Sequence, residues 1–540
     1  MFFKNSSNYF GQFFFFISNY IKNFYLNSNI YNKKISKIHN RIIEYKPSPS
    51  LLDCLIKYEK KKIKIEDLYL NSVWSNKDLT EKDYKNLHSF FWLFSLDLKS
   101  SKKITQSVIL NWIEENNNYN KKNWEVDILS RRIIAWISNS KLTYENSEDE
   151  YKSKFNIIIQ KQINHLINEI EKSKLFDNKM IGCAAIILTG LSFKEDKYLN
   201  FSLTLLKKII NFSFDNQGFP KSRSIRQLNF YLKYFVLIRE WLKESQNEIP
   251  EYIDEIIFYL GKSYSILCQG IKKNILFNGN HEGENNDFDQ YLNNHGYKFK
   301  NNSLEAGGYA ILKNKKISLV MDIGPTPEKK FSKNYQCGAL SFEIISNDKK
   351  LICNSGYFQK TKHKLNTISR SSANHSTLII DNHSSCKINS SKLEIENNLK
   401  ILKKTTVMEK NYWNICASHD GYNKRYGVIH ERKIEFFPEN YKFIGQDKLL
   451  KKKNFKSSDF EIRFHLEPNV KIMKTQDGKS ILIDIENEGW KFTAHGYTID
   501  IETGLYFGKK NSFTENQNLF ISGITQNEDQ IIKWEFKKII

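Results

Sequence analysis

The segment Phe460-Glu-Ile-Arg-Phe-His-Leu466 alternates strictly between apolar and polar side chains. Successive side chains of a strand point to opposite faces, so this alternation predicts a strand with one buried face. Similar short runs, rich in β-branched and aromatic residues, follow one another after Ser303. They cover residues 317–323, 340–345, 377–380, 428–436 and 480–485. Because no helical pattern separates them, we expect an antiparallel β-sandwich.

Residues 50–270 show a different periodicity. Apolar residues recur there at spacings of three and four, which places them on one face of a helix. The clearest stripe consists of Phe155, Ile158, Ile159, Ile163, Leu166, Ile167 and Ile170. Further stripes run through residues 126–137, 203–210 and 230–241. Short polar loops separate the stripes, so we expect an array of helical hairpins that bury their faces against one another.

Two other segments complete the expected organisation. Residues 277–303 are rich in Gly, Asn and acidic residues, which predicts a long loop or domain junction. The first 45 residues are aromatic and basic, but their longest apolar run, residues 13–17, is far short of the ~20 residues that a membrane span needs. No cleavable signal pattern follows. We expect an aromatic helix or an interfacial anchor, without a transmembrane helix. The expected domains are residues 1–45, 46–300 and 301–540.

The net charge of the 540-residue chain is +22. Such a charge suits an acidic partner, namely nucleic acid, an anionic membrane surface or an acidic glycan. It is equally explained by a composition rich in Lys, Asn, Ile, Phe and Tyr, as an AT-rich genome produces. The chain has no zinc-finger spacing and no aromatic RNA-binding signature, so we expect no nucleic-acid partner.

Seven cysteines are widely spaced and form no CxxC motif. This pattern argues against a disulfide framework or a cysteine zinc site and favours reduced thiols. A nucleotide cofactor is not expected, because the chain has no glycine-rich nucleotide-binding motif in a convincing context. A structural divalent metal stays open. The sequence leaves the location open between the cytoplasm and the cell envelope, and it gives no oligomeric state.

Several short polar motifs of the strand-rich half occur in a recognisable order. They are Gly338-Ala-Leu-Ser-Phe-Glu343, Asn354-Ser-Gly-Tyr357, Arg370-Ser-Ser-Ala-Asn-His-Ser-Thr377, His419-Asp-Gly-Tyr422 and Arg463-Phe-His465. In order and spacing they resemble the C-terminal domain of the heparinase II/III-like family. Residues 124–136 and Gly218-Phe-Pro-Lys-Ser-Arg223 are similar to landmarks of the same family. The resemblance covers roughly residues 120–540. It implies a multidomain α+β fold, an incomplete α/α toroid followed by an antiparallel β-sandwich.

Active members of this family cleave uronate-containing glycans by β-elimination. The reaction needs a group that neutralises the carboxylate beside C5, so that negative charge can develop there. It also needs a base for the C5 proton and an acid for the departing oxygen. The family uses Asn or Arg for the first role and His and Tyr for the others.

The resemblance assigns these roles to residues of this chain. His375 matches the family's histidine in the segment after Arg370, and imidazole changes protonation near neutral pH; a hydrogen-bonded histidine at a strand start is the ordinary alternative. Arg370 would pair with a sugar carboxylate or form a structural salt bridge. Arg223 would be a catalytic cation or an ordinary surface arginine. Asn178 would be the neutralising amide or a helix cap.

Four further side chains are candidates for the site. Tyr422 is a candidate acid and His419 a candidate substrate-binding residue, with a tight Asp-Gly turn and a packed tyrosine as the alternative. Tyr231 and Tyr234 would bind substrate, although tyrosines at helical spacing are more often core residues. A metal site from Asp381, His383 and His419 is conceivable, but scattered histidines rarely form one.

Three departures from the family pattern weaken the catalytic hypothesis. Lys179 and Cys337 stand where relatives carry histidines, and Gln227 stands where active relatives carry a tyrosine about nine residues after the loop glycine. The sequence therefore supports two hypotheses. The first is a polysaccharide lyase for an acidic glycan; the second is a non-catalytic glycan-binding protein of cell-envelope polysaccharide biogenesis. A glycoside hydrolase would need two carboxylates about 5–9.5 Å apart, and no obvious pair is present.

Overall fold

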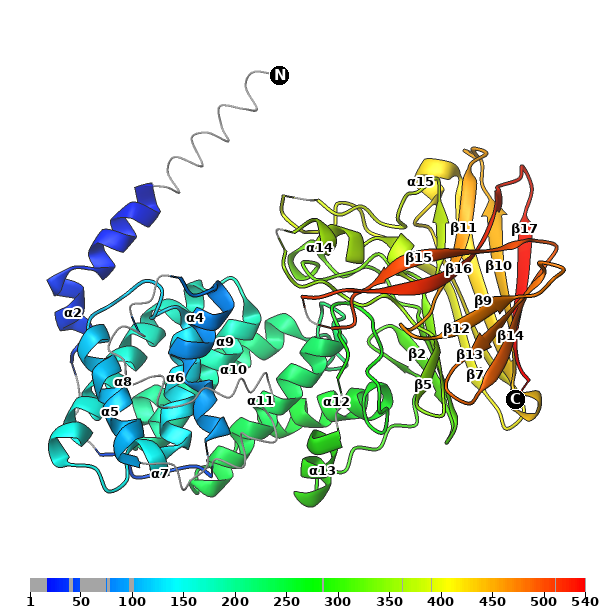
Figure 1. Cartoon of the computed structure of the whole chain (residues 1–540). Helices are drawn as coiled ribbons and strands as arrows, with labels where there is room; N and C mark the ends of the chain where they lie inside the picture. The colour runs from blue at the N-terminus through cyan, green and yellow to red at the C-terminus, as the bar shows by residue number, and fades with distance from the viewer. Residues whose placement is uncertain are drawn as a thin grey trace. The chain divides into compact units, whose positions relative to one another are not determined.

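The computed structural model describes residues 17–37, 42–48, 74, 78–96, 102–283, 286–361, 363–389, 391–509 and 511–539. The chain divides into two compact units, residues 1–212 with 233–255 and residues 213–232 with 256–540. Helices come first along the chain and strands follow, as the colours of Figure 1 show. The change from helix to strand comes between α13 (Asn286–Asn294) and β1 (Glu305–Ala306). The compact units are not continuous in sequence, because residues 213–232 belong to the second unit and residues 233–255 to the first. The aromatic run before Ile17, and Cys54, lie outside the described residues.

The helices of the first 300 residues have the following bounds. They are α2 (Asn29–Ile35), α4 (Glu81–Ser89), α5 (Lys102–Asn116), α6 (Val126–Ser138), α7 (Ser140–Thr143), α8 (Asp149–Glu169), α9 (Phe176–Ser192), α10 (Asp196–Ser213), α11 (Ile225–Glu244), α12 (Glu251–Leu267) and α13 (Asn286–Asn294). The segment 277–303 is therefore not all loop. It contains α13, which buries Phe288, Tyr291 and Leu292.

The predicted apolar stripes account for the packing of these helices. In α8 the stripe residues Phe155, Ile158 and Ile163 are fully buried. The helix α6 begins and ends within one residue of the predicted range 126–137. At the start of α4 the hydroxyl of Thr80 accepts a hydrogen bond from the Asp83 backbone N–H, which satisfies an amide that has no partner within the helix.

The N-terminal segment is helical, as expected, over residues 17–26 and again in α2. Leu26, Tyr31 and Ile35 are buried, and the Tyr31 hydroxyl lies 2.7 Å from Nδ1 of His165 on α8. These contacts fix the segment to the helical unit. Within the described part of the chain, every helix is too short or too polar to cross a bilayer.

The described residues of the second half form seventeen strands, and all their pairings within sheets are antiparallel. One sheet contains β1 (Glu305–Ala306), β2 (Tyr309–Lys313), β3 (Ile317–Asp322), β4 (Phe342–Ser346) and β5 (Lys349–Ile352) in sequential order. A second has the order β12 (Lys471–Lys474), β13 (Ser480–Asp484), β14 (Gly489–His495), β17 (Gln530–Lys538), β10 (Lys442–Lys451), β9 (Val428–Phe437), β8 (Trp413–His419) and β7 (Ile401–Met408). A third has the order β15 (Ile499–Tyr506), β16 (Thr514–Ile524), β11 (Asp459–His465) and β6 (Leu378–Ile380).

The three sheets share one apolar core, and Trp534 of β17 lies within it. Its indole stacks on Phe342 of β4 at 5.4 Å and meets Phe464 of β11 edge-on at 5.1 Å. Phe464 belongs to the alternating segment that predicted a half-buried strand. The buried face of that strand therefore supplies one of the contacts between the sheets.

Two cysteines correct the expectation of reduced thiols. Cys337 and Cys386, 49 residues apart in sequence, form a disulfide with Cα atoms 5.6 Å apart. The other described cysteines form no disulfide and are buried. The bond ties the loop after β6 to the segment before β4, so it covalently braces the region that contains the motif residues 370–377.

Gly445 of β10 is predicted to be essential for the core, because the Trp534 indole lies across it. A Cβ atom at this position would lie 2.1 Å from the indole ring. We expect Gly445→Ala to lower the free energy of unfolding by about 1–3 kcal/mol, since overpacking displaces the indole. Denaturant unfolding measures this loss. The control Ile531→Ala, at an exposed position of β17, is expected to change stability by less than about 1 kcal/mol; equal effects of the two substitutions would contradict the packing argument.

Candidate functional site

Arg223 is held inside the second unit by backbone carbonyls and one carboxylate. Its guanidinium donates to the carbonyls of Gly307, Gly308 and Pro325 at 2.8–3.1 Å. It also donates to Oδ1 of Asp322, on β3, at 2.5 Å. Only 7% of the residue is exposed. These contacts leave the guanidinium no face for a sugar carboxylate and give Arg223 a structural role instead of the expected one.

The surroundings of Arg223 are built for this ion pair. The backbone of Arg223 has a φ of +59°, which is costly for a residue with a side chain. A Cβ at Gly324 would lie 2.4 Å from the guanidinium carbon, so only glycine leaves room there. Burial by itself would lower the pKa of Arg223, but Asp322 and the neighbouring phenols raise it overall. The arginine therefore stays charged.

Further polar groups join this ion pair in a cluster that we call the polar junction, consisting of Arg223, Asn278, Tyr309, Asp322 and Gln336. The Tyr309 hydroxyl donates to the Arg223 carbonyl at 2.6 Å and lies 2.5 Å from the Asn278 amide nitrogen. The Asn278 oxygen accepts from the Gln336 backbone N–H at 3.1 Å. Gln336 in turn accepts from the Gly279 N–H and donates to the carbonyls of Gly356 and Ser369. The junction ties the start of α11, the loop before α13 and the segment before β4 together.

A half-buried residue, Asn334, and a buried one, Tyr357, lie beside the junction. The Tyr357 hydroxyl donates to Oδ1 of Asn334 at 3.1 Å. A Cβ built on Gly279 would lie 3.5 Å from the Asn334 side chain and 3.8 Å from the Ser224 hydroxyl. Neither Asn334 nor Tyr357 received a role from the sequence, although Tyr357 ends one of the quoted motifs. The motif order was the available signal, and it did not show that the Tyr357 hydroxyl has a side-chain amide as its partner.

His375 is the predicted site residue with the least ordinary surroundings. It is 1% exposed, and neither ring nitrogen has a hydrogen-bond partner among the described residues. Its ring packs against Gly338, where a Cβ would lie 2.9 Å from the ring. Burial lowers the pKa of His375 to about 3, so the imidazole is neutral at physiological pH. Leaving buried polar atoms unpaired costs about 1–3 kcal/mol each, which singles this residue out.

The backbone around His375 is fixed by its neighbours. The Ser376 backbone N–H donates to Oδ1 of Asn354 at 3.0 Å. The Thr377 hydroxyl donates to the Ala339 carbonyl at 2.7 Å. These contacts fix the backbone that follows His375, while its ring is held by packing.

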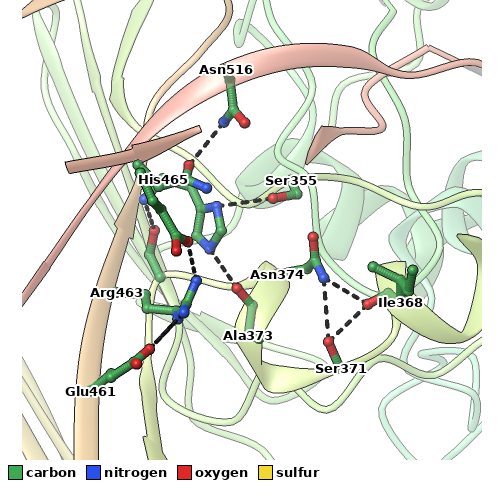
Figure 2. Close-up of polar contacts among 12 residues, drawn as sticks. Ser355, Ile368, Ser371, Ala373, Asn374, Glu461, Arg463, His465 and Asn516 are labelled. Carbon is green, nitrogen blue, oxygen red and sulfur yellow. Dashed lines mark hydrogen bonds and ion pairs between the residues drawn. The ribbon is translucent and has the colours of Figure 1, made fainter. Parts of the chain in front are cut away.

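A second buried histidine, His465 of β11, lies close to this segment and is shown in Figure 2. Its Nε2 lies 3.0 Å from the Ala373 carbonyl and its Nδ1 3.0 Å from the Ser355 hydroxyl. Since a carbonyl can only accept, Nε2 carries the proton and Nδ1 accepts from Ser355. Figure 2 also shows Asn374 donating to the Ile368 carbonyl, which fixes the other end of the segment.

Arg370 occupies a cage of carbonyl groups. It donates to the carbonyls of Tyr335, Ser332 and Leu393 at 2.8–3.0 Å and is 1% exposed. Burial lowers the pKa of Arg370. These contacts connect three loops, so the guanidinium acts as a brace and does not face a glycan.

His419 and Tyr422 also have internal partners. The Tyr422 hydroxyl donates to the Leu378 carbonyl at 2.7 Å, and burial raises its pKa. Nε2 of His419 lies 3.3 Å from Nδ1 of His430, whose Nε2 lies 2.6 Å from Asp447. A single neutral tautomer of each imidazole satisfies this row of hydrogen bonds, so neither ring needs a positive charge. The packed-tyrosine alternative describes Tyr422 better than the role of an exposed acid.

The remaining predicted residues lie as follows. Tyr231 and Tyr234 are buried on α11, as core aromatics are. Asn178 lies half-buried in the first turn of α9, and the neighbouring Lys179 ammonium lies 5.5 Å from the Phe176 ring. Gln227 accepts a hydrogen bond from the Ser222 hydroxyl. The metal site considered from Asp381, His383 and His419 receives no support. His419 contacts His430, and the described residues contain no cluster of three potential metal ligands.

Comparisons with known proteins agree with the quoted motifs. Residues 298–535 match the family described as heparinase II/III-like, C-terminal. This stretch of the chain is a heparinase II/III-like C-terminal domain. A solved heparinase III superposes with a TM-score of 0.70 at 15% identity, covering 93% of this chain and 88% of its own. A mutant of the heparan sulfate lyase HepC from Pedobacter heparinus gives 0.67 at 13% identity, covering 94% and 85%. The comparison with curated proteins gave no match.

These similarities confirm the expected fold class. The chain has its helices in the N-terminal half, matching the α/α toroid of these structures, and antiparallel sheets in the C-terminal half, matching their β-sandwich. At such low identity the superpositions establish the fold and do not transfer an activity.

The neutral state of buried His375 predicts a specific pH dependence of stability. Its pKa is about 3 in the folded chain and 6.5 ordinarily, so below pH 6.5 the unfolded chain binds a proton that the folded chain does not. Stability therefore falls as the pH falls from 6.5 towards 3. We expect His375→Gln to make this fall shallower by about one proton, measured by denaturant unfolding across this range. His465, whose pKa is also lowered to about 3, keeps its contribution, and an unchanged slope would contradict the assignment.

Proposed function

We propose that this protein acts as a lyase on an acidic, uronate-containing polysaccharide. The fold similarity along most of the chain supports this class of substrate, and the net charge of +22 suits a polyanion. The observation that carries the proposal is the buried, unpartnered imidazole of His375.

In the proposed reaction His375 takes the proton from C5 of a uronate. The C5–H electrons form a C4=C5 double bond, the bond from C4 to the glycosidic oxygen breaks, and an acid gives that oxygen a proton. A pKa near 3 makes a weak base. A sugar carboxylate beside the ring would raise that pKa, because a nearby negative charge favours the imidazolium. The proposal requires that glycan binding opens access to the ring.

Two further roles need side chains, namely neutralising the sugar carboxylate and donating the proton to the departing oxygen. Asn178, a half-buried amide at the start of α9 in the first unit, stays a candidate neutralising group on the sequence resemblance alone. Tyr357 is a better candidate acid than Tyr422, because its hydroxyl donates to a side-chain amide and not to a backbone carbonyl, although both tyrosines are buried. Arg223, with its carbonyl and carboxylate partners, would act indirectly, by fixing the loop that it braces.

A second candidate function is binding of the same glycan without cleavage. The specific observation in its favour is that Gln227 stands where the resemblance leads one to expect a tyrosine. The internal partners of Tyr422 and Arg370 point the same way. In this case the fold would present a glycan-binding surface without a complete acid–base set.

The disulfide bears on the location of either function. Disulfides persist in oxidising compartments and are rare in reducing ones. The Cys337–Cys386 bond therefore supports the cell envelope over the cytoplasm.

Incubation with a panel of uronate polymers tests the lyase proposal. We expect a product whose C4=C5 double bond absorbs in the ultraviolet, and we expect His375→Ala to reduce the rate by at least about 100-fold, since acid–base groups contribute about 10²–10⁴-fold. Circular dichroism checks that the variant is folded. Full activity in a folded variant would remove His375 from the reaction. Absence of product from every polymer, together with saturable binding, would instead support glycan binding without cleavage.

A further inference from the structure

A surface pocket of about 650 Å³ lies in the second unit, apart from His375 and the polar junction's own side chains. Its volume falls within the roughly 300–1,000 Å³ that small-ligand sites occupy. The walls come from the loop before Gly218, from α12, from the segment before β1 and from β7. The polar and aromatic lining includes Asn216, Gln217, Tyr259, Lys262, Asn301 and Ser303.

The lining has the side chains that bind a sugar ring. Tyr259 is 36% exposed, so part of its ring is available as an apolar platform. It packs closely on Gly218, where a Cβ would lie 2.4 Å from the Tyr259 Cβ, so its position is fixed. The amides of Asn216, Gln217 and Asn301 offer donors and acceptors for hydroxyl groups.

The charges of the lining favour an anionic ligand. Lys404 pairs with Glu305 at 2.5 Å, and the Thr406 hydroxyl donates to the same carboxylate at 2.9 Å. This pair is internally neutral. Lys262 lies 4.4 Å from the Phe258 ring and, among the described residues, has no carboxylate within ion-pair distance. The pocket therefore has one uncompensated positive charge beside an aromatic ring.

The floor of the pocket is fixed from beneath by Arg223. Gly307 and Gly308 line the pocket, and their carbonyls accept hydrogen bonds from the Arg223 guanidinium at 3.1 and 3.0 Å. Arg223 is anchored in turn by Asp322. A floor held by a buried ion pair is pre-organised, so little ordering remains when a ligand binds.

We propose that this pocket binds one acidic sugar residue of a glycan, with the sugar ring on Tyr259 and its carboxylate or sulfate on Lys262. The assignment of this pocket relies on the proposed function for one point only, the class of ligand, which is an acidic glycan. It does not require that the chain cleaves that glycan.

Titration calorimetry with the full chain tests the pocket. The probes are a polyuronate tetrasaccharide, a sulfated uronate tetrasaccharide and a neutral glucose tetrasaccharide. We expect the acidic probes to bind and Lys262→Met to weaken them about tenfold, as loss of one hydrogen bond to a charged group does. Tyr259→Leu is expected to weaken the same probes by a similar factor. The relative affinity of the two acidic probes shows whether carboxylate or sulfate is preferred.

Lys315→Met is the matched control, because Lys315 is exposed in the turn between β2 and β3, outside the pocket lining. It is expected to bind the acidic probes like the parent. The pocket assignment would be overturned if Lys262→Met and Tyr259→Leu both bound the acidic probes as tightly as the parent does. It would also be overturned if the parent bound the neutral probe as tightly as the acidic ones. If the chain is not a lyase, no unsaturated product forms, but the binding that depends on Lys262 remains. The two proposals can therefore fail independently of each other.

Discussion

The buried ion pair between Arg223 and Asp322 is the constraint on which the second unit depends. A charged guanidinium inside a protein is stable only when its donors are satisfied, and here three carbonyls and one carboxylate satisfy them. The requirement fixes the left-handed backbone of Arg223. It also requires glycine before β2 and after β3, because a Cβ at Gly308 or at Gly324 would collide with the guanidinium. One interaction therefore joins a loop of the helical half of the sequence to the first sheet.

The same physical rule separates structural polar groups from candidate functional ones. Arg370, His419 and Tyr422 are buried and have hydrogen-bond partners, although Nη1 of Arg370 has none among the described residues. His375 is buried without a partner for either ring nitrogen. In a region braced by a disulfide and by Arg370, such an imidazole is held in position by packing alone. That contrast, and not histidine content as such, is the reason to place the proposed chemistry at His375.

The fold was largely predictable because its elements carry local signals. The range 428–436 predicted β9, which spans Val428–Phe437, since one buried face enforces alternation. The helix α13 was missed, because its Asn- and Asp-rich sequence has the composition of a loop; its apolar residues at i, i+3 and i+4, Phe288, Tyr291 and Leu292, were the available sign.

The site was less predictable, because its decisive contacts are distant in sequence. Asp322 lies 99 residues after Arg223, and the carbonyl groups that surround Arg223 and Arg370 have no sequence signature. The sequence identified these arginines as special without revealing that they are buried. The disulfide partners are likewise 49 residues apart, and neither lies in a motif that predicts pairing.

A double-mutant cycle on Arg223→Met and Asp322→Asn, followed by denaturant unfolding, tests the central claim most directly. Breaking a buried pair leaves an uncompensated charge, so each single substitution is expected to cost about 3–5 kcal/mol. The double substitution is expected to cost clearly less than the two singles together, because it leaves no unpaired charge. Single variants as stable as the parent, with only glycan turnover reduced, would contradict the account and return Arg223 to a catalytic role.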